Sequence, residues 1–275
     1  INCFVNFAYI DQWGGVVKAV SQECNFKTVC IQNASHDPEE YPKLWADSYC
    51  VESIYLKDRL IKLGYPENQI HATGLPHYVA GTQIAKRRIP GVSERKILIL
   101  TQPIYTRYYE QIMNECAAFC SESGYIMVIK YHPRQSGDEY ARFLAGLSKK
   151  CKIEVFQNES LDDMIVASQL VISVFSAALI RALNLQVPAL AFVPKRSKHL
   201  YLPFTDSENL FVVSNIKELN GVFSLLDQDQ DSLVKDFQKR LANYAANHCT
   251  FEGTASSVDN VVNVIKSAIH LAAKS

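Results

Sequence analysis

The chain has 275 residues, of which 48% are hydrophobic, enough to build the core of one large or two smaller globular domains. Lys and Arg total 28, and Asp and Glu also total 28, so no overall field attracts nucleic acid, and we expect no nucleic-acid partner. The eight cysteines form no C-x-x-C pair and fall mostly in apolar runs, which predicts buried, reduced thiols and a cytosolic location.

The first third of the chain alternates strand-like and helix-like patterns. We expect strands at 3–10, 27–31, 47–51 and 70–73, and helices at 15–23 and 57–63. Residues 80–94 lose this periodicity and gain charge, Gly and Pro, as an interdomain linker does. We therefore predict a first domain at 1–85. The strand-like pattern already begins at the opening of the chain, so we expect this domain to be incomplete, with part of the function carried by residues before Ile1.

The next hundred residues repeat the alternation. The predicted strands are 96–100, 125–130, 153–156, 170–173 and 189–193, and the predicted helices are 108–121, 138–147, 161–167 and 177–183. This order predicts an α/β fold with a parallel, doubly wound sheet and right-handed crossovers. Three helical patterns follow at 216–226, 232–247 and 255–273. We predict a second domain at 86–250 and a terminal helical segment at 251–275.

A histidine follows the strand-like pattern 125–130. Pro133 restricts the residue before it to extended backbone, so His132 is expected at the carboxyl edge of the sheet, where its ring can donate to a phosphate oxygen. Lys130 and Arg134 lie two residues to either side, and in an extended chain they would project on the same face and add positive charge. The ordinary alternative is a turn histidine between two solvated cations.

A second polar loop, Ser173-Val174-Phe175-Ser176, ends a buried strand pattern and opens the helix pattern 177–183. One serine can cap that helix, and the other hydroxyl can join the N–H groups of the first turn in cradling an anion. Capping alone is the ordinary alternative. Phe175 is a further candidate contact of the same loop. Two such strand ends in one parallel sheet are suited to an anionic nucleotide, so we predict a nucleotide site formed by both loops.

Thr101 and Gln102 end the strand pattern 96–100, where the first turn of a doubly wound sheet faces the ligand crevice. They can hydrogen-bond ribose, phosphate or an acceptor, although an ordinary polar loop explains them equally well. The motifs G-x-G-x-x-G, G-x-x-x-x-G-K-[ST] and G-x-S-x-G do not occur, which argues against a dinucleotide oxidoreductase, a P-loop NTPase and a serine hydrolase. No His, Cys and Asp cluster has metal-ligand spacing, so we expect no metal and no cofactor.

Several segments resemble the end of the N-terminal domain in bacterial GT-B glycosyltransferases that build capsule and lipopolysaccharide. They are residues 46–51, 56–66 and 70–76, and residues 29–33 are similar to the strand and loop that come before. The resemblance covers nearly the whole chain. It implies a GT-B fold of two Rossmann-like domains: the first predicted domain on the acceptor side, the second binding the nucleotide-sugar donor, and the terminal helix packing across both.

The elements His132-Pro133 and Ser173/Ser176 are similar to the HP and paired-serine motifs of the CMP-sugar enzymes of that superfamily, the sialyl-, polysialyl- and Kdo-transferases. This resemblance implies a CMP-linked sugar as the donor substrate. It also implies that His132 binds the phosphate and assists as CMP departs, and that the two serines complete the phosphate cradle. The implied acceptor is an oligosaccharide or glycolipid of a surface polysaccharide.

The general base departs from the pattern of those families, which supply it from a D/E-D/E-G string that this chain lacks. Glu39-Glu40 has no following Gly. Asp11, after the first strand pattern, is the best-placed carboxylate, although a helix cap is an equal alternative. Arg181 stands where related enzymes often carry a Glu that holds ribose.

No apolar stretch reaches the roughly 18 residues of a spanning helix. We expect a cytoplasmic enzyme, with the basic run 194–199 as a candidate contact for an anionic acceptor or for peripheral association with the inner membrane face, and a solvated loop as its alternative. Three other functions stay open: a sugar-nucleotide 2-epimerase, a CDP-polyol phosphotransferase, and a non-catalytic module that binds a nucleotide.

Overall fold

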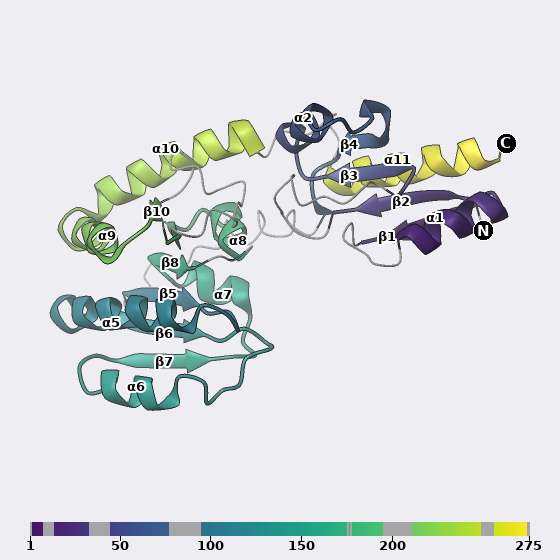
Figure 1. Cartoon of the computed structure of the whole chain (residues 1–275). Helices are drawn as coiled ribbons and strands as arrows, with labels where there is room; N and C mark the ends of the chain where they lie inside the picture. Colours follow the sequence, from purple (N-terminus) through teal and green to yellow (C-terminus); the bar gives the residue numbers. More distant parts are fainter. Residues whose placement is uncertain are drawn as a thin grey trace. The chain divides into compact units, whose positions relative to one another are not determined.

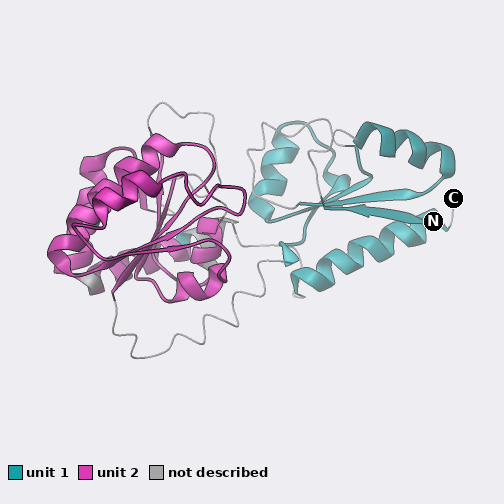
Figure 2. Cartoon of the chain, turned by 90° about the horizontal axis from the view of Figure 1, so that it is seen from below, with its two compact units in different colours: residues 1–80, 201–203, 243–275 teal, residues 81–200, 204–242 magenta. Residues whose placement is uncertain are grey.

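The computed structural model divides the chain into two compact units (Figure 2). Unit 1 comprises residues 1–80, 201–203 and 243–275, and unit 2 comprises residues 81–200 and 204–242. The structure describes residues 2–7, 14–32, 45–76, 95–174, 176, 178–194, 211–248 and 256–273. The domain boundaries predicted at 85/86 and 250/251 lie outside these residues.

Unit 1 contains a four-stranded parallel sheet with the strands in chain order (Figure 1). The strands are β1 (Cys3–Asn6), β2 (Lys27–Ile31), β3 (Ser48–Val51) and β4 (Ile70–Ala72). The helices that alternate with them are α1 (Gly14–Cys24), α2 (Ile54–Lys62) and the single 3-10 turn η2 (Glu67–Gln69). Ser53 caps α2 by accepting the N–H of Leu56 at 3.2 Å. The expected alternation is confirmed, except that residues 8–10 of the first predicted strand lie outside the described part.

The sheet of unit 1 is buried on both faces. Helix α11 (Ser257–Ala272) covers one face, where Val261 and Ala268 pack against Val29, Ile31 and Cys50. The opposite face packs against a second cluster of apolar side chains, which includes Trp45, Tyr49, Leu56 and Leu60. Strand side chains alternate between faces with a period of two, which is why adjacent residues such as Tyr49 and Cys50 belong to different clusters.

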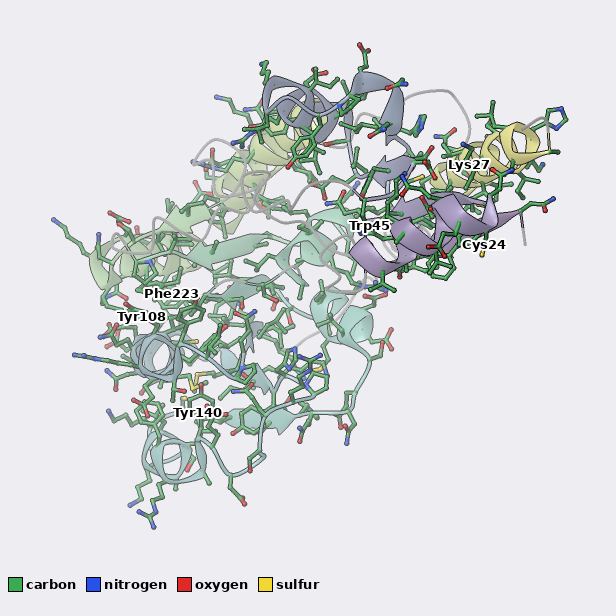
Figure 3. All side chains as sticks on the ribbon, turned by 45° about the vertical axis from the view of Figure 1, so that its right-hand side comes forward. Cys24, Lys27, Trp45, Tyr108, Tyr140 and Phe223 are labelled. Atoms are coloured by element: carbon green, nitrogen blue, oxygen red, sulfur yellow. The ribbon has the colours of Figure 1, made fainter. Side chains whose placement is uncertain are left out.

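A tryptophan fixes the start of α1 in unit 1. The indole of Trp45, which is labelled in Figure 3, lies directly against Gly14. A Cβ atom at position 14 would overlap the ring. Trp45 and Ala46 also donate their backbone N–H groups to the hydroxyl of Tyr49, at 2.6 and 2.8 Å. Glycine is therefore required at position 14 by close packing.

Unit 2 contains a six-stranded parallel sheet in the order β10-β9-β8-β5-β6-β7. Its strands are β5 (Lys96–Leu100), β6 (Ile126–Lys130), β7 (Ile153–Phe156), β8 (Leu170–Ser173), β9 (Ala189–Phe192) and β10 (Phe211–Val213). The predicted parallel, doubly wound α/β sheet is confirmed. Strand β10 was not predicted.

The helices of unit 2 lie on both faces of its sheet. They are α5 (Thr106–Ser123), α6 (Ala141–Leu147), α7 (Leu161–Val166), α8 (Ala178–Asn184) and α9 (Ile216–Gln228), and α10 (Gln230–His248) contains the division between the units. Helix α5 contacts α6 and α9, whereas α7 contacts α8. Right-handed crossovers that run in opposite directions place their helices on opposite faces, which accounts for α5 and α6 on one face and α7 and α8 on the other. The ring of Phe223, which is labelled in Figure 3, stacks on the ring of Phe119 with the centroids 4.9 Å apart, and this contact joins α5 to α9.

The seven described cysteines form no disulfide. Cys30, Cys50, Cys116 and Cys120 are buried, as predicted, whereas Cys24 is exposed. Burial raises the pKa of the Cys116 thiol, which keeps it protonated and unreactive. In the described part of the chain, no helix is long and apolar enough to cross a membrane.

Candidate functional site

The chain reverses its direction across the sheet of unit 2 at β5. From β5 it moves outward through β6 and β7, then returns to the other side of β5 to form β8, β9 and β10. Strands β5 and β8 are therefore neighbours at the switch point, and open parallel sheets bind ligands outside the carboxyl ends of their strands at this point. Leu100 pairs with Lys130 and Ile99 pairs with Ile172, so the loops after β5, β6 and β8 leave the sheet at one edge.

Ser173 joins the two central strands at this edge. It is fully buried, and its hydroxyl donates to the carbonyl of Leu100 at 2.7 Å. The hydroxyl of Tyr109 lies 3.1 Å from the same oxygen. The Ser173 side chain thus bonds within the protein and ties β8 to β5 and α5, and its expected contact with a ligand stays a prediction.

Ser176 lies at the start of α8 and is half-buried. Its hydroxyl accepts the N–H of Ala178 at 3.2 Å, and its carbonyl accepts the N–H of Leu179 at 3.0 Å. These are capping bonds, and the anion cradle expected beside them stays a prediction. Phe175 and the proposed base Asp11 lie outside the described residues.

The backbone around His132 fixes the protonation of its ring. The N–H of Arg134 donates to Nδ1 of His132 at 3.1 Å, so Nδ1 carries a lone pair and Nε2 carries the proton. Burial and the charge of Arg134 lower the pKa of His132, which keeps the ring neutral at pH 7. The imidazole therefore presents one N–H donor, at Nε2, as phosphate binding requires.

The chain beyond His132 turns instead of staying extended. The N–H of Gln135 donates to the carbonyl of His132 at 2.9 Å, which closes a turn with Pro133 and Arg134 exposed at its tip. Nζ of Lys130 donates to the carbonyl of Gln157, in the loop after β7, at 2.8 Å. The expectation that Lys130, His132 and Arg134 project together from an extended strand is therefore wrong.

Gln135 connects the loops after β5 and β6, and the sequence did not single it out. It is 5% exposed, and its Oε1 accepts the hydroxyl of Thr101 at 2.5 Å and the N–H of His132 at 3.0 Å. Its Nε2 donates to the carbonyl of Gln102 at 3.0 Å and to Glu139 at 2.9 Å. One buried amide thus holds the histidine turn against Thr101 and Gln102. No local pattern marks this role, because the partners Thr101 and Gln102 are distant in sequence.

Thr101 and Gln102 lie at the crevice in different environments. Thr101 is buried and commits its hydroxyl to Gln135. Gln102 is half-buried, and its Oε1 lies 3.4 Å from the hydroxyl of Tyr109. Of the two, Gln102 has the side chain that is better placed to reach a ligand, and this contact stays a prediction.

Arg181, which stands where related enzymes often carry a ribose-holding Glu, forms an ion pair within the protein. Its Nε and Nη2 atoms both donate to the carboxylate of Asp162, which joins α8 to α7. The Asp162 side chain is 9% exposed. Two parallel bonds from one guanidinium to one carboxylate fix the orientation of both groups.

Tyr109 is the second residue of the crevice that the sequence did not single out. Its hydroxyl lies within 3.1–3.4 Å of Ser173 Oγ, the N–H of Val174 and Gln102 Oε1. Burial raises the pKa of this hydroxyl, so it stays protonated. It belongs to the buried stripe of α5, and such a tyrosine is indistinguishable in sequence from an ordinary core residue.

The Tyr109→Phe variant is expected to lose about 1–2 kcal/mol of unfolding free energy, because buried groups of Ser173 and Val174 lose a partner. The matched control is Tyr125→Phe, at a residue that lies between the end of α5 and the start of β6. Tyr125 is 2% exposed, and its hydroxyl has no hydrogen-bond partner among the described residues. The control is expected to change stability by about 0.5 kcal/mol or less. Urea denaturation of the two variants measures the difference, and equal losses would show that the crevice bonds contribute nothing.

Comparison with known proteins shows the fold of the chain. No family model and no curated protein matches it. Among solved structures, it is similar to a protein described as a UDP-N-acetylglucosamine 2-epimerase from Listeria monocytogenes, with 12% identity, a TM-score of 0.66, and coverage of 100% of this chain and 75% of that one. It is also similar to UDP-GlcNAc 2-epimerase from Neisseria meningitidis bound to UDP-GlcNAc, with 10% identity, a TM-score of 0.65, and coverage of 98% and 76%.

A third similar structure is the wall teichoic acid polymerase TagF soaked with CDPG, with 12% identity, a TM-score of 0.60, and coverage of 98% of this chain and 72% of that one. All three identities are low, so these likenesses establish architecture alone. The chain has the GT-B fold, with two Rossmann-like units that each carry a parallel sheet.

Proposed function

We propose that unit 2 binds the nucleotide of an activated sugar at the carboxyl edge over β5 and β8, and that the protein transfers this sugar to a surface-polysaccharide acceptor. The observation that carries the proposal is the switch point of the sheet, where Gln102, Ser176 and the Nε2–H donor of His132 follow neighbouring strand ends. The preferred donor is a CMP-linked sugar such as sialic acid or Kdo.

The proposed reaction is a single displacement. A carboxylate, for which Asp11 is our candidate, removes the proton of an acceptor hydroxyl, which then attacks the anomeric carbon of the donor. Negative charge grows on the departing phosphate, so a donor such as His132 Nε2–H stabilises the transition state more than the ground state. The neutral ring already carries a proton at Nε2, so it supplies this hydrogen bond at pH 7 without first binding another proton.

A sugar-nucleotide 2-epimerase is the second candidate, because two of the three similar structures carry that name. An epimerase of this kind would change UDP-GlcNAc with no acceptor present. A polyol phosphotransferase, favoured by the likeness to TagF, would release CMP from a CDP-linked donor. A non-catalytic module would bind a nucleotide and leave every donor intact.

The proposal places the protein in the cytoplasm, with an oligosaccharide or glycolipid acceptor and peripheral attachment at the inner membrane face. The basic run 194–199, suggested for such a contact, lies outside the described residues after Pro194.

A thermal-shift panel of CMP, CDP, UDP and GDP tests the proposal. Ligands that bind the native state raise its apparent stability by mass action, so the preferred nucleotide gives the largest increase in Tm. We expect CMP or CDP to rank first. A dominant response to UDP would favour the epimerase, and incubation with UDP-GlcNAc alone would then reveal the epimerised sugar. The absence of any shift with all four nucleotides would overturn the nucleotide site.

A further inference from the structure

A cavity of about 640 Å³ opens at the amino edge of the unit 2 sheet, the edge opposite the candidate site. The last turn of α5, the first residue of β6 and the residues just before β7 form its walls. Tyr125 and Lys152 lie at these strand starts, whereas Lys130 and Phe156 end the same strands at the other edge. At 3.3 Å per residue, the two edges lie on the order of 15 Å apart. The cavity is therefore separate from the proposed nucleotide site.

Three cationic side chains line this cavity, and none of its described lining residues carries a carboxylate. Arg95 and Lys150 form no ion pair with a described carboxylate. Nζ of Lys152 lies 3.3 Å from one carboxylate oxygen of Glu154, and the other oxygen of Glu154 lies 3.0 Å from Nζ of Lys96. The carboxyl end of α5 adds only about half a negative charge. The cavity thus retains excess positive charge, and a bound anion would relieve the repulsion between its cations.

Tyr125 positions one of these cations. The guanidinium of Arg95 lies over the Tyr125 ring, 5.6 Å from its centroid. Such a contact orients an arginine side chain while leaving its N–H donors available. Tyr125 lines the cavity, and burial raises the pKa of its hydroxyl, with a smaller contribution from the carboxylate of Asp227 on α9. The arrangement therefore combines an oriented guanidinium with two ammonium groups around one concave surface.

We propose that this cavity is a second ligand site, which binds a diphosphate group. The fork of Arg95 can hold one phosphate through two parallel bonds, and Lys150 and Lys152 can neutralise the other. The volume is within the range of small-molecule sites, so the diphosphate can be free or attached to a nucleoside. The proposal is independent of the function assigned to the carboxyl edge.

Cys151 provides a reporter inside the cavity. It lines the wall between Lys150 and Lys152 and is partly exposed, whereas Cys24 is exposed in unit 1. Iodoacetamide labels both thiols of the native protein, and peptide mass spectrometry follows each rate separately. At a pyrophosphate concentration ten times its dissociation constant, the labelling rate of Cys151 should fall about tenfold, in proportion to the unliganded fraction. The labelling rate of Cys24 should not change when pyrophosphate is added. Sodium chloride of equal ionic strength, added in place of pyrophosphate, should change neither labelling rate.

Two substitutions and two control variants test whether the protection of Cys151 depends on the cations of the cavity. Protection of Cys151 should disappear in Arg95→Gln and in Lys150→Gln, each compared with the same variant without ligand. Lys149→Gln removes one charge from an exposed neighbour that does not line the cavity, and should keep the protection. His132→Ala should also keep it, which separates this site from the nucleotide site.

Parallel runs with UDP distinguish free diphosphate from diphosphate on a nucleoside, and protection by either supports the site. The proposal fails if neither compound slows Cys151, if Arg95→Gln and Lys150→Gln remain protected, or if Lys149→Gln loses protection as they do.

Discussion

Replacing Gln135 with alanine is expected to destabilise unit 2 strongly. The change removes all four side-chain bonds of a buried amide. It leaves the N–H of His132 without its acceptor and the hydroxyl of Thr101 with only the longer bond to the carbonyl of Lys130, at 3.3 Å. Buried polar groups left without partners cost more than an average hydrogen bond contributes, so we expect a loss of about 2–4 kcal/mol. Urea denaturation followed by far-UV circular dichroism measures it.

Gln157→Ala is the matched control for this variant. The Gln157 side chain is half-buried and donates one bond, from Nε2 to the carbonyl of Gln135 at 2.9 Å. Its loss should cost about 0.5–1.5 kcal/mol, as for a typical single hydrogen bond. Equal destabilisation by both substitutions would contradict the central role of Gln135, and so would a Gln135→Ala protein that keeps full nucleotide affinity.

Replacing His132 with alanine is expected to abolish the thermal shift given by the preferred nucleotide at a concentration near the dissociation constant of the parent protein. The variant removes the Nε2–H donor but leaves the turn, because backbone groups and Gln135 close it. One hydrogen bond to a charged phosphate corresponds to about 1.5–3 kcal/mol, so the dissociation constant should rise by about ten- to a hundredfold. Isothermal titration calorimetry with that nucleotide measures the change.

His270→Ala is the control for the loss of an imidazole as such, since His270 lies exposed on α11 in unit 1. This variant should bind the nucleotide with unchanged affinity. If His132→Ala also binds normally while the parent protein shows a clear nucleotide response, the nucleotide lies elsewhere and the assignment of His132 is wrong.

The sheet of unit 2 could be predicted because its strands are short apolar runs bounded by polar loops. Strands such as Lys96–Leu100 and Ile126–Lys130 are buried along nearly their whole length, as in other parallel sheets. Strand β10 has only three residues, Phe211–Val213, which is too short for a periodic signal. The predicted helix at 138–147 begins only at Ala141. Asp138 belongs to a turn before the helix, in which its carbonyl accepts the N–H of Ala141.

The candidate site could be predicted only in part, because spacing along the chain locates loops but not the bonds between them. The position of His132 after a strand was readable, and the turn that follows was not, since it depends on Gln135 and on Thr101, 34 residues earlier. Tyr109 is similar: it matches the apolar stripe of α5, and its role appears only when Ser173, 64 residues later, lies beside it. Long-range polar bonds leave no local signature.

The packing of α11 on unit 1 has a consequence for synthesis. During translation, the apolar side chains of Val29, Ile31 and Cys50 emerge from the ribosome more than two hundred residues before Val261 and Ala268, which finally shield them. Unit 2 is contained in the intervening sequence and can fold first. Until α11 is synthesised, one face of the unit 1 sheet keeps its apolar side chains exposed to solvent. In this interval we expect the nascent chain to bind chaperones or to aggregate most readily.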